Sequence, residues 1–196
     1  MCEVYKGKAP VSLQVIGSNI LEDYELTRSQ ILTFNMVKSY QLKMIERPVP
    51  EVHWFYGPTG AGKDRAAHEF SSFRETYEKD GTNFWQDYSG EETIIISDVD
   101  DKHGLDFRTI LRLTDRYQFR GNVKGGHTYI VSKRIVFTSD VHPQKCLNLS
   151  HYQWKQLERR IKENGGSLKE FGDDDLMDQI AQAQRNISNT MLYSSD

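Results

Sequence analysis

A glycine-rich loop between an apolar run and a helical segment is the feature that most constrains this chain. The loop consists of Gly57, Pro58, Thr59, Gly60, Ala61, Gly62 and Lys63, and it matches the pattern G-x-x-x-x-G-K. Glycines let the backbone curve into a nest of N–H groups, and the helix that follows directs its positive end at the same point. Because Lys63 can reach the terminal phosphates, the loop predicts nucleotide binding in an α/β fold.

Three short runs rich in β-branched and aromatic residues are typical of buried strands: Val52–Tyr56, Thr93–Ile96 and Ile135–Thr138. Helical patterns alternate with them over Lys63–Tyr77 and Phe107–Tyr117. Strands that alternate with helices indicate a central, mostly parallel sheet flanked by helices.

Weaker patterns predict four further elements. Helix-compatible mixtures of apolar and polar residues cover Thr27–Met44 and Tyr152–Lys162. Glycines between β-compatible residues predict a hairpin or a projecting loop over Gln118–Tyr129. A short helix is expected over Asp175–Arg185.

These patterns divide the chain into three parts. Residues 1–47 form a helical segment, which Pro48 and Pro50 terminate, and residues 48–163 form one P-loop NTPase domain. Residues 164–196 carry two basic and six acidic residues, a net charge of −4, and we expect a mobile tail there. Because the whole chain has a formal charge of −3, the rest is nearly neutral, and any contact with nucleic acid must be local.

Cysteine usage and hydropathy point to an intracellular protein. Cys2 and Cys146 do not form a C-x-x-C pair, so we expect neither a disulfide framework nor a zinc site. No apolar run approaches the ~18 residues that a membrane span needs, and we recognise no secretory leader. We therefore expect a nuclear or cytoplasmic protein that is not secreted and does not bind a membrane.

An apolar strand that leads into acidic residues follows the loop. Ile96 precedes Ser97 and Asp98, and in P-loop NTPases such a strand end holds magnesium and orients the attacking water. The residue after the loop lysine is normally Ser or Thr, whose hydroxyl binds magnesium, but here it is Asp64. We expect Asp64, Ser97 and Asp98 to be the metal ligands.

Five further motifs follow the loop in a fixed order: Trp85–Glu92, Leu111–Tyr117, Val123–Gly126, Arg134–Asp140 and Leu157–Ile161. In this order they resemble the helicase half of the replication-associated (Rep) proteins of circovirus-like viruses, which have small circular single-stranded DNA genomes. The resemblance covers about residues 50–162. It implies a superfamily 3 helicase with an AAA+-like fold, which hydrolyses ATP with Mg²⁺ and assembles as a ring, usually a hexamer. Such a helicase moves along single-stranded DNA, with RNA as an open alternative, in the host nucleus or cytoplasm.

The resemblance also implies roles for single residues. It assigns catalytic roles to Lys63, Asp98, Asp140, Arg159 and Arg160. Asp140 stands at the sensor position, and Arg159 or Arg160 is the finger that reaches the nucleotide of a neighbouring subunit. Lys124 in the glycine-rich hairpin and the nearby His127 contact nucleic acid. Residues 1–47 resemble linker and oligomerisation helices.

The chain departs from the family at three site positions. Asp64 stands where the family has Ser or Thr, Ser97 stands where it has an acidic residue, and Asp140 stands where it has an asparagine. One interpretation is decay, in which the carboxylate of Asp64 repels the triphosphate and the metal is lost. The other is exchange, in which the hydroxyl and the carboxylate that bind magnesium have swapped positions, so that the net ligand charge is unchanged.

A full-length Rep also carries a nuclease domain with a His-x-His metal site and a tyrosine nucleophile. His53 is the only histidine before the loop, so the His-x-His metal site is missing and we expect no nicking activity. Whether the sequence is a complete product or a piece of a larger Rep stays open. The favoured function is an ATP-dependent helicase or translocase in viral-type rolling-circle DNA replication. The alternative is a catalytically degenerate module that binds nucleotide or nucleic acid.

Overall fold

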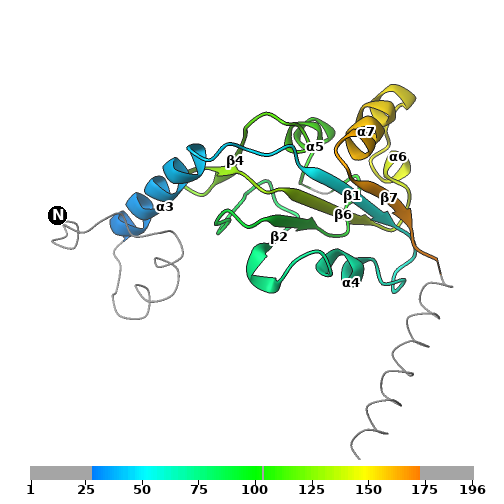
Figure 1. Ribbon diagram of the computed structural model, residues 1–196, viewed down its shortest axis with the longest axis horizontal. Coiled ribbons are helices and arrows are strands. Elements are labelled where there is room, and N and C mark those ends of the chain that lie inside the picture. The colour runs from blue at the N-terminus through cyan, green and yellow to red at the C-terminus, as the bar shows by residue number, and fades with distance from the viewer. Residues whose placement is uncertain (1–27, 103, 173–196) are drawn as a thin grey trace, which may run out of the picture.

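The computed structural model describes residues 28–102 and 104–172 of the 196-residue chain (Figure 1). Its helices are α3 (Arg28–Lys43), α4 (Lys63–His68), α5 (Phe107–Leu113), α6 (Pro143–Cys146) and α7 (His151–Glu163), with a 3-10 turn, η2, at Phe73–Glu75. Its strands are β1 (Glu51–Tyr56), β2 (Thr76–Lys79), β3 (Thr93–Ile96), β4 (Phe119–Val123), β5 (Gly126–Ile130), β6 (Arg134–Ser139) and β7 (Ser167–Glu170). Among the described residues, no helix is both long and apolar enough to cross a membrane.

Five strands form one sheet in the order β2-β3-β6-β1-β7, and every neighbouring pair is parallel. Parallel sheets need cover on both faces, which explains why the central strands are continuous apolar runs. Figure 1 shows α4 on one side of the sheet and α5 and α7 on the other. The predicted α/β class, with a mostly parallel sheet flanked by helices, is confirmed.

Side chains of the central strands alternate between two hydrophobic cores. Trp54 of β1 and Phe137 of β6 stack with their ring centroids 4.5 Å apart, and they share the larger core with Leu157 of α7. Phe55, the next residue of β1, packs in the smaller core with Ala67 of α4. Because successive side chains of a strand point to opposite faces, both cores hold β1 and therefore the start of the glycine loop.

The predicted hairpin over Gln118–Tyr129 is confirmed as a separate antiparallel pair, β4 and β5. Trp85 joins it to the domain, because its backbone N–H donates to the carbonyl of Asn122 at 2.8 Å and its buried ring packs on Gly121. A Cβ at position 121 would collide with that ring, so this close approach requires glycine. α3 packs against β5, and its Leu42 is buried in the larger core.

The prediction of a helix over Lys63–Tyr77 is wrong beyond His68. α4 ends at His68, and Thr76–Lys79 form β2, which pairs with β3 at one edge of the sheet that the described residues form. An edge strand has one neighbour and accepts polar residues, so β2 lacks the apolar run that marks the central strands.

The helix predicted over Phe107–Tyr117 also ends early, at Leu113. The guanidinium of Arg47 donates to the carbonyl oxygen of Leu113, which the helix end leaves without a helical partner, and to that of Tyr117 in the turn beyond. This contact joins the segment before β1 to the end of α5.

The expected domain boundary after residue 163 is wrong. Ser167–Glu170 form β7, which pairs with β1, and Phe171 is buried in the smaller core. At the other end, Leu42 packs in the larger core, so residues 28–47 pack as part of the same unit. The helix expected over Asp175–Arg185 lies outside the described residues.

Candidate functional site

The strand order brings three loops to one end of the sheet. β6 lies between β1 and β3, and the three strands run in the same direction. The glycine loop follows β1, Asp140 follows β6, and Ser97 and Asp98 follow β3. Ligands of open α/β sheets bind at the carboxyl ends of the strands, so the fold unites three of the predicted motifs.

The glycine loop curves tightly between β1 and α4. Gly60 and Gly62 have φ values of 86° and 88°, in the left-handed region. A side chain at Gly57 would collide with the carbonyl oxygen of Phe171, so the segment after β7 closes against the start of the loop. Ala61 and Phe171 pack in the same core, which braces the loop from within the domain.

Lys63 is the first residue of α4, and its side chain is only 6% exposed. Its ammonium donates to the carbonyl oxygens of Gly57 and Pro58 at 2.7 and 3.0 Å. It also lies 3.3 Å from Oδ1 of Asp140, which the hydroxyl of Thr59 approaches at 3.5 Å. Three oxygens therefore hold a buried positive charge inside the loop, where an anionic ligand would meet it.

Asp64 and Asp98 are joined through Thr138 of β6. The Thr138 hydroxyl donates to Oδ1 of Asp64 at 2.9 Å and accepts the backbone N–H of Asp98 at 3.1 Å. Asp98 has a φ of 52°, so the chain turns sharply after β3. In the described part of the chain, no hydrogen bond joins the side chain of Ser97 to either aspartate.

Two of the three predicted magnesium ligands, Asp64 and Asp98, suit a metal that arrives with a nucleotide, whereas the role of Ser97 stays a prediction. Within residues 28–102 and 104–172, no group of three or more His, Cys, Asp or Glu side chains is arranged to hold a metal ion. Mg²⁺ is commonly bound by one or two carboxylates together with phosphates and water. Asp64 and Asp98 supply two exposed carboxylates beside the phosphate loop, which suits that ligand set.

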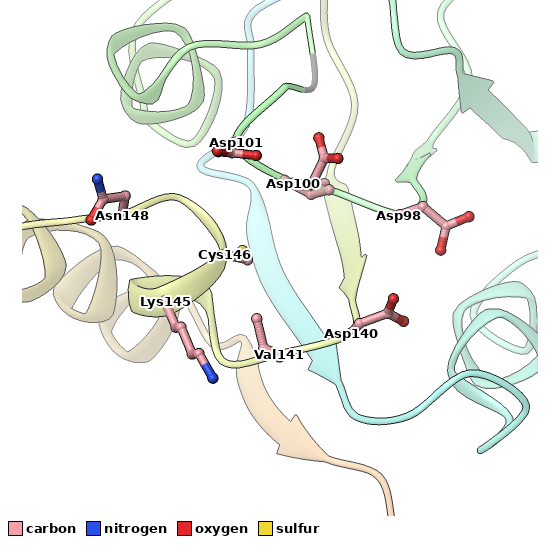
Figure 2. A pocket seen from close by; sticks show the side chains of 9 residues that line it. Asp98, Asp100, Asp101, Asp140, Val141, Lys145, Cys146 and Asn148 are labelled. Carbon is pink, nitrogen blue, oxygen red and sulfur yellow. The ribbon is translucent and has the colours of Figure 1, made fainter.

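A cleft of about 570 Å³ opens beside the loop (Figure 2). Its lining is mainly acidic and polar: Asp98, Val99, Asp100, Asp101, Asp140, Val141, Lys145, Cys146 and Asn148. Figure 2 places Asp98 and Asp140 on one side of the cleft and Asn148 on the other. Burial raises the pKa of the Cys146 thiol to about 11, so this thiol stays protonated at neutral pH. A thiol in that state is no nucleophile.

The two candidate arginines of α7 have different environments. The guanidinium of Arg160 lies 2.9 Å from a carboxylate oxygen of Asp115, and its side chain is 20% exposed. Burial opposes ionisation of Asp115, but hydrogen bonds from Arg160 and from the backbone of Arg116 outweigh it and lower its pKa. Arg159 is 64% exposed, with its Nε 3.7 Å from Glu163. Arg160 thus joins α7 to the segment after α5, whereas Arg159 extends into solvent.

Lys124 and His127 lie together on the β4–β5 hairpin, beside α3 (Figure 1). Both side chains are exposed, and the Lys124 N–H donates to the side-chain oxygen of Gln86 at 3.1 Å. The rings of His127 and Tyr129 meet edge to face, with centroids 5.5 Å apart. Both predicted nucleic-acid residues therefore share one anchored, exposed element, and their binding stays a prediction.

Sequence patterns alone missed two residues of the site. Thr138 stands in a predicted strand, where a threonine signals only β-propensity. Phe171 lies in the segment that was expected to be a tail. Leu168 and Phe171, two isolated apolar residues, were the only signal for β7 and its packing against the loop.

Known proteins resemble the chain over this region. The model of the RNA helicase family matches residues 53–141. The chain is 36% identical over 117 residues to the replication-associated protein of goose circovirus, covering 58% of this chain and 37% of that protein. It is 41% identical over 95 residues to the replication-associated protein of canary circovirus, covering 48% of this chain and 31% of that protein. It is 30% identical over 128 residues to that of human associated cyclovirus 1, covering 59% and 45%.

The chain therefore spans less than half of the length of these curated relatives. Two solved structures are also similar. NtrX from Brucella abortus in complex with ADP has a TM-score of 0.42 at 14% identity, over 78% of this chain and 38% of that one. AMPPCP-bound DnaA from Aquifex aeolicus has a TM-score of 0.38 at 19% identity, over 86% of this chain and 55% of that one.

Proposed function

The chain contains a superfamily 3 helicase domain of the Rep type, and we propose that it is an ATP-dependent helicase or translocase. It acts on single-stranded DNA, with RNA as the alternative, in viral-type rolling-circle replication. ATP binds in the glycine loop, and Mg²⁺ comes with it.

The observation that carries this proposal is the placement of Lys63. Its ammonium is buried, belongs to the first turn of a helix and lies inside a loop whose glycines have positive φ. A fixed cation, backbone N–H groups and the positive end of a helix together form an anion site suited to a polyphosphate. The chemistry that Mg²⁺ supplies is neutralisation of the developing phosphate charge. Asp64 and Asp98 would hold it.

Nucleic-acid binding belongs to the hairpin. Lys124 at the turn offers a cation to the phosphate backbone, and His127 and Tyr129 offer rings against which a base can stack. The hairpin is anchored along its strand β4, where Trp85 contacts Gly121 and Asn122, so a force on its tip is transmitted to the domain. Binding there without sequence preference follows from this chemistry.

Arg159 is the arginine that we propose as the finger of a ring, most simply a hexamer. Arg160 already has a short ion pair within the chain, and recruiting it would leave Asp115 without that partner. Arg159 is exposed, and its 3.7 Å contact with Glu163 is weak. Its guanidinium can therefore leave Glu163 and reach the nucleotide of a neighbouring subunit with little loss of stability.

The test is ATP hydrolysis in the presence of Mg²⁺, with and without single-stranded DNA. The wild type should hydrolyse ATP, and DNA should stimulate it. Lys63→Ala should lose nucleotide binding and turnover, because it removes the one fixed cation of the loop. Lys133→Ala is a matched control, since Lys133 is an exposed lysine paired with Glu92 away from the loop. Equal turnover in both variants would remove the loop from the mechanism.

A second candidate, a binding module without turnover, is favoured by the contact between Lys63 and Asp140. A carboxylate beside the phosphate loop opposes an anionic ligand and cannot donate as an asparagine amide does. Nucleotide or DNA binding with no hydrolysis under any of these conditions would support this candidate over the helicase.

A further inference from the structure

Two parts of the site meet at one buried hydroxyl, that of Thr138. Thr138 lies in the central strand β6 and has no exposed surface. Its Oγ1 is bonded to the Asp64 carboxylate, in the first turn of α4, and to the backbone of Asp98, after β3. Its carbonyl oxygen also accepts the N–H of Val99 at 2.8 Å. One residue thus ties the helix after the glycine loop to the turn after the acidic strand.

The direction of both side-chain bonds follows from the chemistry of the groups. A backbone N–H can only donate, so the hydroxyl oxygen accepts from Asp98. An ionised carboxylate can only accept, so the hydroxyl proton points to Asp64. The hydroxyl therefore donates its single proton to Asp64, the residue after the loop lysine, where the family usually has Ser or Thr.

We propose that Thr138 is a positioning residue, which fixes the Asp64 carboxylate relative to Asp98 and thereby sets how strongly Mg²⁺ supports nucleotide binding. This inference rests on the proposed function. A β-branched residue in a central strand has a restricted χ1, so its hydroxyl is a rigid point of attachment. The Asp64 side chain is exposed and would otherwise sample several rotamers.

The contact explains how an aspartate can serve in place of the usual hydroxyl. A charge-assisted hydrogen bond stabilises the carboxylate and occupies one of its oxygens. The remaining lone pairs of Asp64 are then presented from a fixed position. The backbone N–H of Asp98 donates to the same hydroxyl, so the Asp64 carboxylate keeps a fixed position relative to the turn that carries Asp98.

The experiment compares three variants of the full chain. Thr138→Val removes the hydroxyl and nearly keeps the shape, whereas Thr138→Ser keeps the hydroxyl. Thr93→Val is the matched control, because Thr93 is also fully buried but its hydroxyl has no hydrogen-bond partner in the described structure. If Thr138→Val does not fold, Thr138→Cys replaces it, since a thiol is a weak donor of similar size.

The first measurement needs no ligand. It uses NMR to determine the hydrogen-exchange rate of the Asp98 backbone amide. Exchange should be roughly tenfold faster in Thr138→Val than in the wild type, because the amide loses its acceptor. It should be unchanged in Thr138→Ser and Thr93→Val. An unchanged rate in Thr138→Val would overturn the proposal.

The second measurement is the affinity for a non-hydrolysable ATP analogue with and without Mg²⁺. We expect Thr138→Val to reduce the gain from Mg²⁺ by roughly tenfold, the size expected for a charge-assisted hydrogen bond, with affinity in the absence of the metal unchanged. Thr138→Ser should keep the gain. If the wild type binds the analogue and Thr138→Val shows the same gain in affinity from Mg²⁺, this inference alone is overturned. Absence of nucleotide binding by the wild type would instead overturn the proposed function, and the inference with it.

Discussion

Replacing Asp140 by asparagine tests whether this carboxylate competes with a nucleotide for Lys63. The two charges lie 3.3 Å apart, with the Lys63 side chain 6% exposed and that of Asp140 66% exposed. At this separation the attraction is ~1.3 kcal/mol in the dielectric of water and ~5 kcal/mol at an effective dielectric constant of about 20. Because Asp140 is largely solvated, the net value lies near the lower figure, about 1 kcal/mol.

A phosphate that binds Lys63 must replace this contact and lies close to a like charge. Asp140→Asn removes both costs, keeps the shape of the side chain and adds an amide that can donate to an anion. A difference of ~1 kcal/mol corresponds to about fivefold, so a triphosphate analogue should bind about five times more tightly. The gain should be smaller for a diphosphate, which carries less charge, and smaller at high salt, which screens an exposed carboxylate.

The assay is a fluorescence titration with a non-hydrolysable triphosphate analogue and with a diphosphate, at about 50 and about 500 mM salt. Asp101→Asn is the matched control, because Asp101 lines the same cleft and has no ion pair with Lys63. Unchanged or weaker triphosphate binding by Asp140→Asn would refute the competition. So would an equal gain in Asp101→Asn, because it would reflect only the net charge of the cleft.

Three further outcomes are expected. Lys124→Ala should weaken binding of single-stranded DNA for all sequences and lower the salt slope, measured by anisotropy, with nucleotide affinity unchanged. Asp64→Ser and Ser97→Asp should each lower Mg²⁺ affinity or ATP turnover, whereas the double variant keeps both, with a coupling of roughly 0.5–3 kcal/mol in a double-mutant cycle. Additive effects would favour decay at Asp64. Hydrogen bonds to Glu78 and to the Asp64 carbonyl raise the pKa of His68 above its usual 6.5, so its stabilisation is complete below that value and is lost as pH rises through the folded-state pKa. His68→Ala should therefore lower Tm more at about pH 5.5 than at about pH 8.5, and an equal loss at both would contradict the charged pair.

The central strands and the phosphate loop could be predicted because their signals are local. β1, β3 and β6 are apolar runs since they are buried on both faces, and the glycine loop has its strand and helix directly beside it in the sequence. β2 and β7 could not be predicted in the same way. They lie at the two edges of the sheet, and their sequences, Thr76–Lys79 and Ser167–Glu170, are largely polar.

The sequence by itself determined the chemical groups of the site: the loop lysine, the acids after β3 and β6, and the paired arginines of α7. Only the tertiary structure decided how these groups are placed relative to one another. Thr138 is 74 residues from Asp64 and 40 from Asp98, and it meets both because β6 lies between β1 and β3. Arg160 is set apart from Arg159 by an ion pair with Asp115, which no local pattern contains. Hydrogen bonds and ion pairs of this kind depend on distances in space, and those are set by the order of the strands.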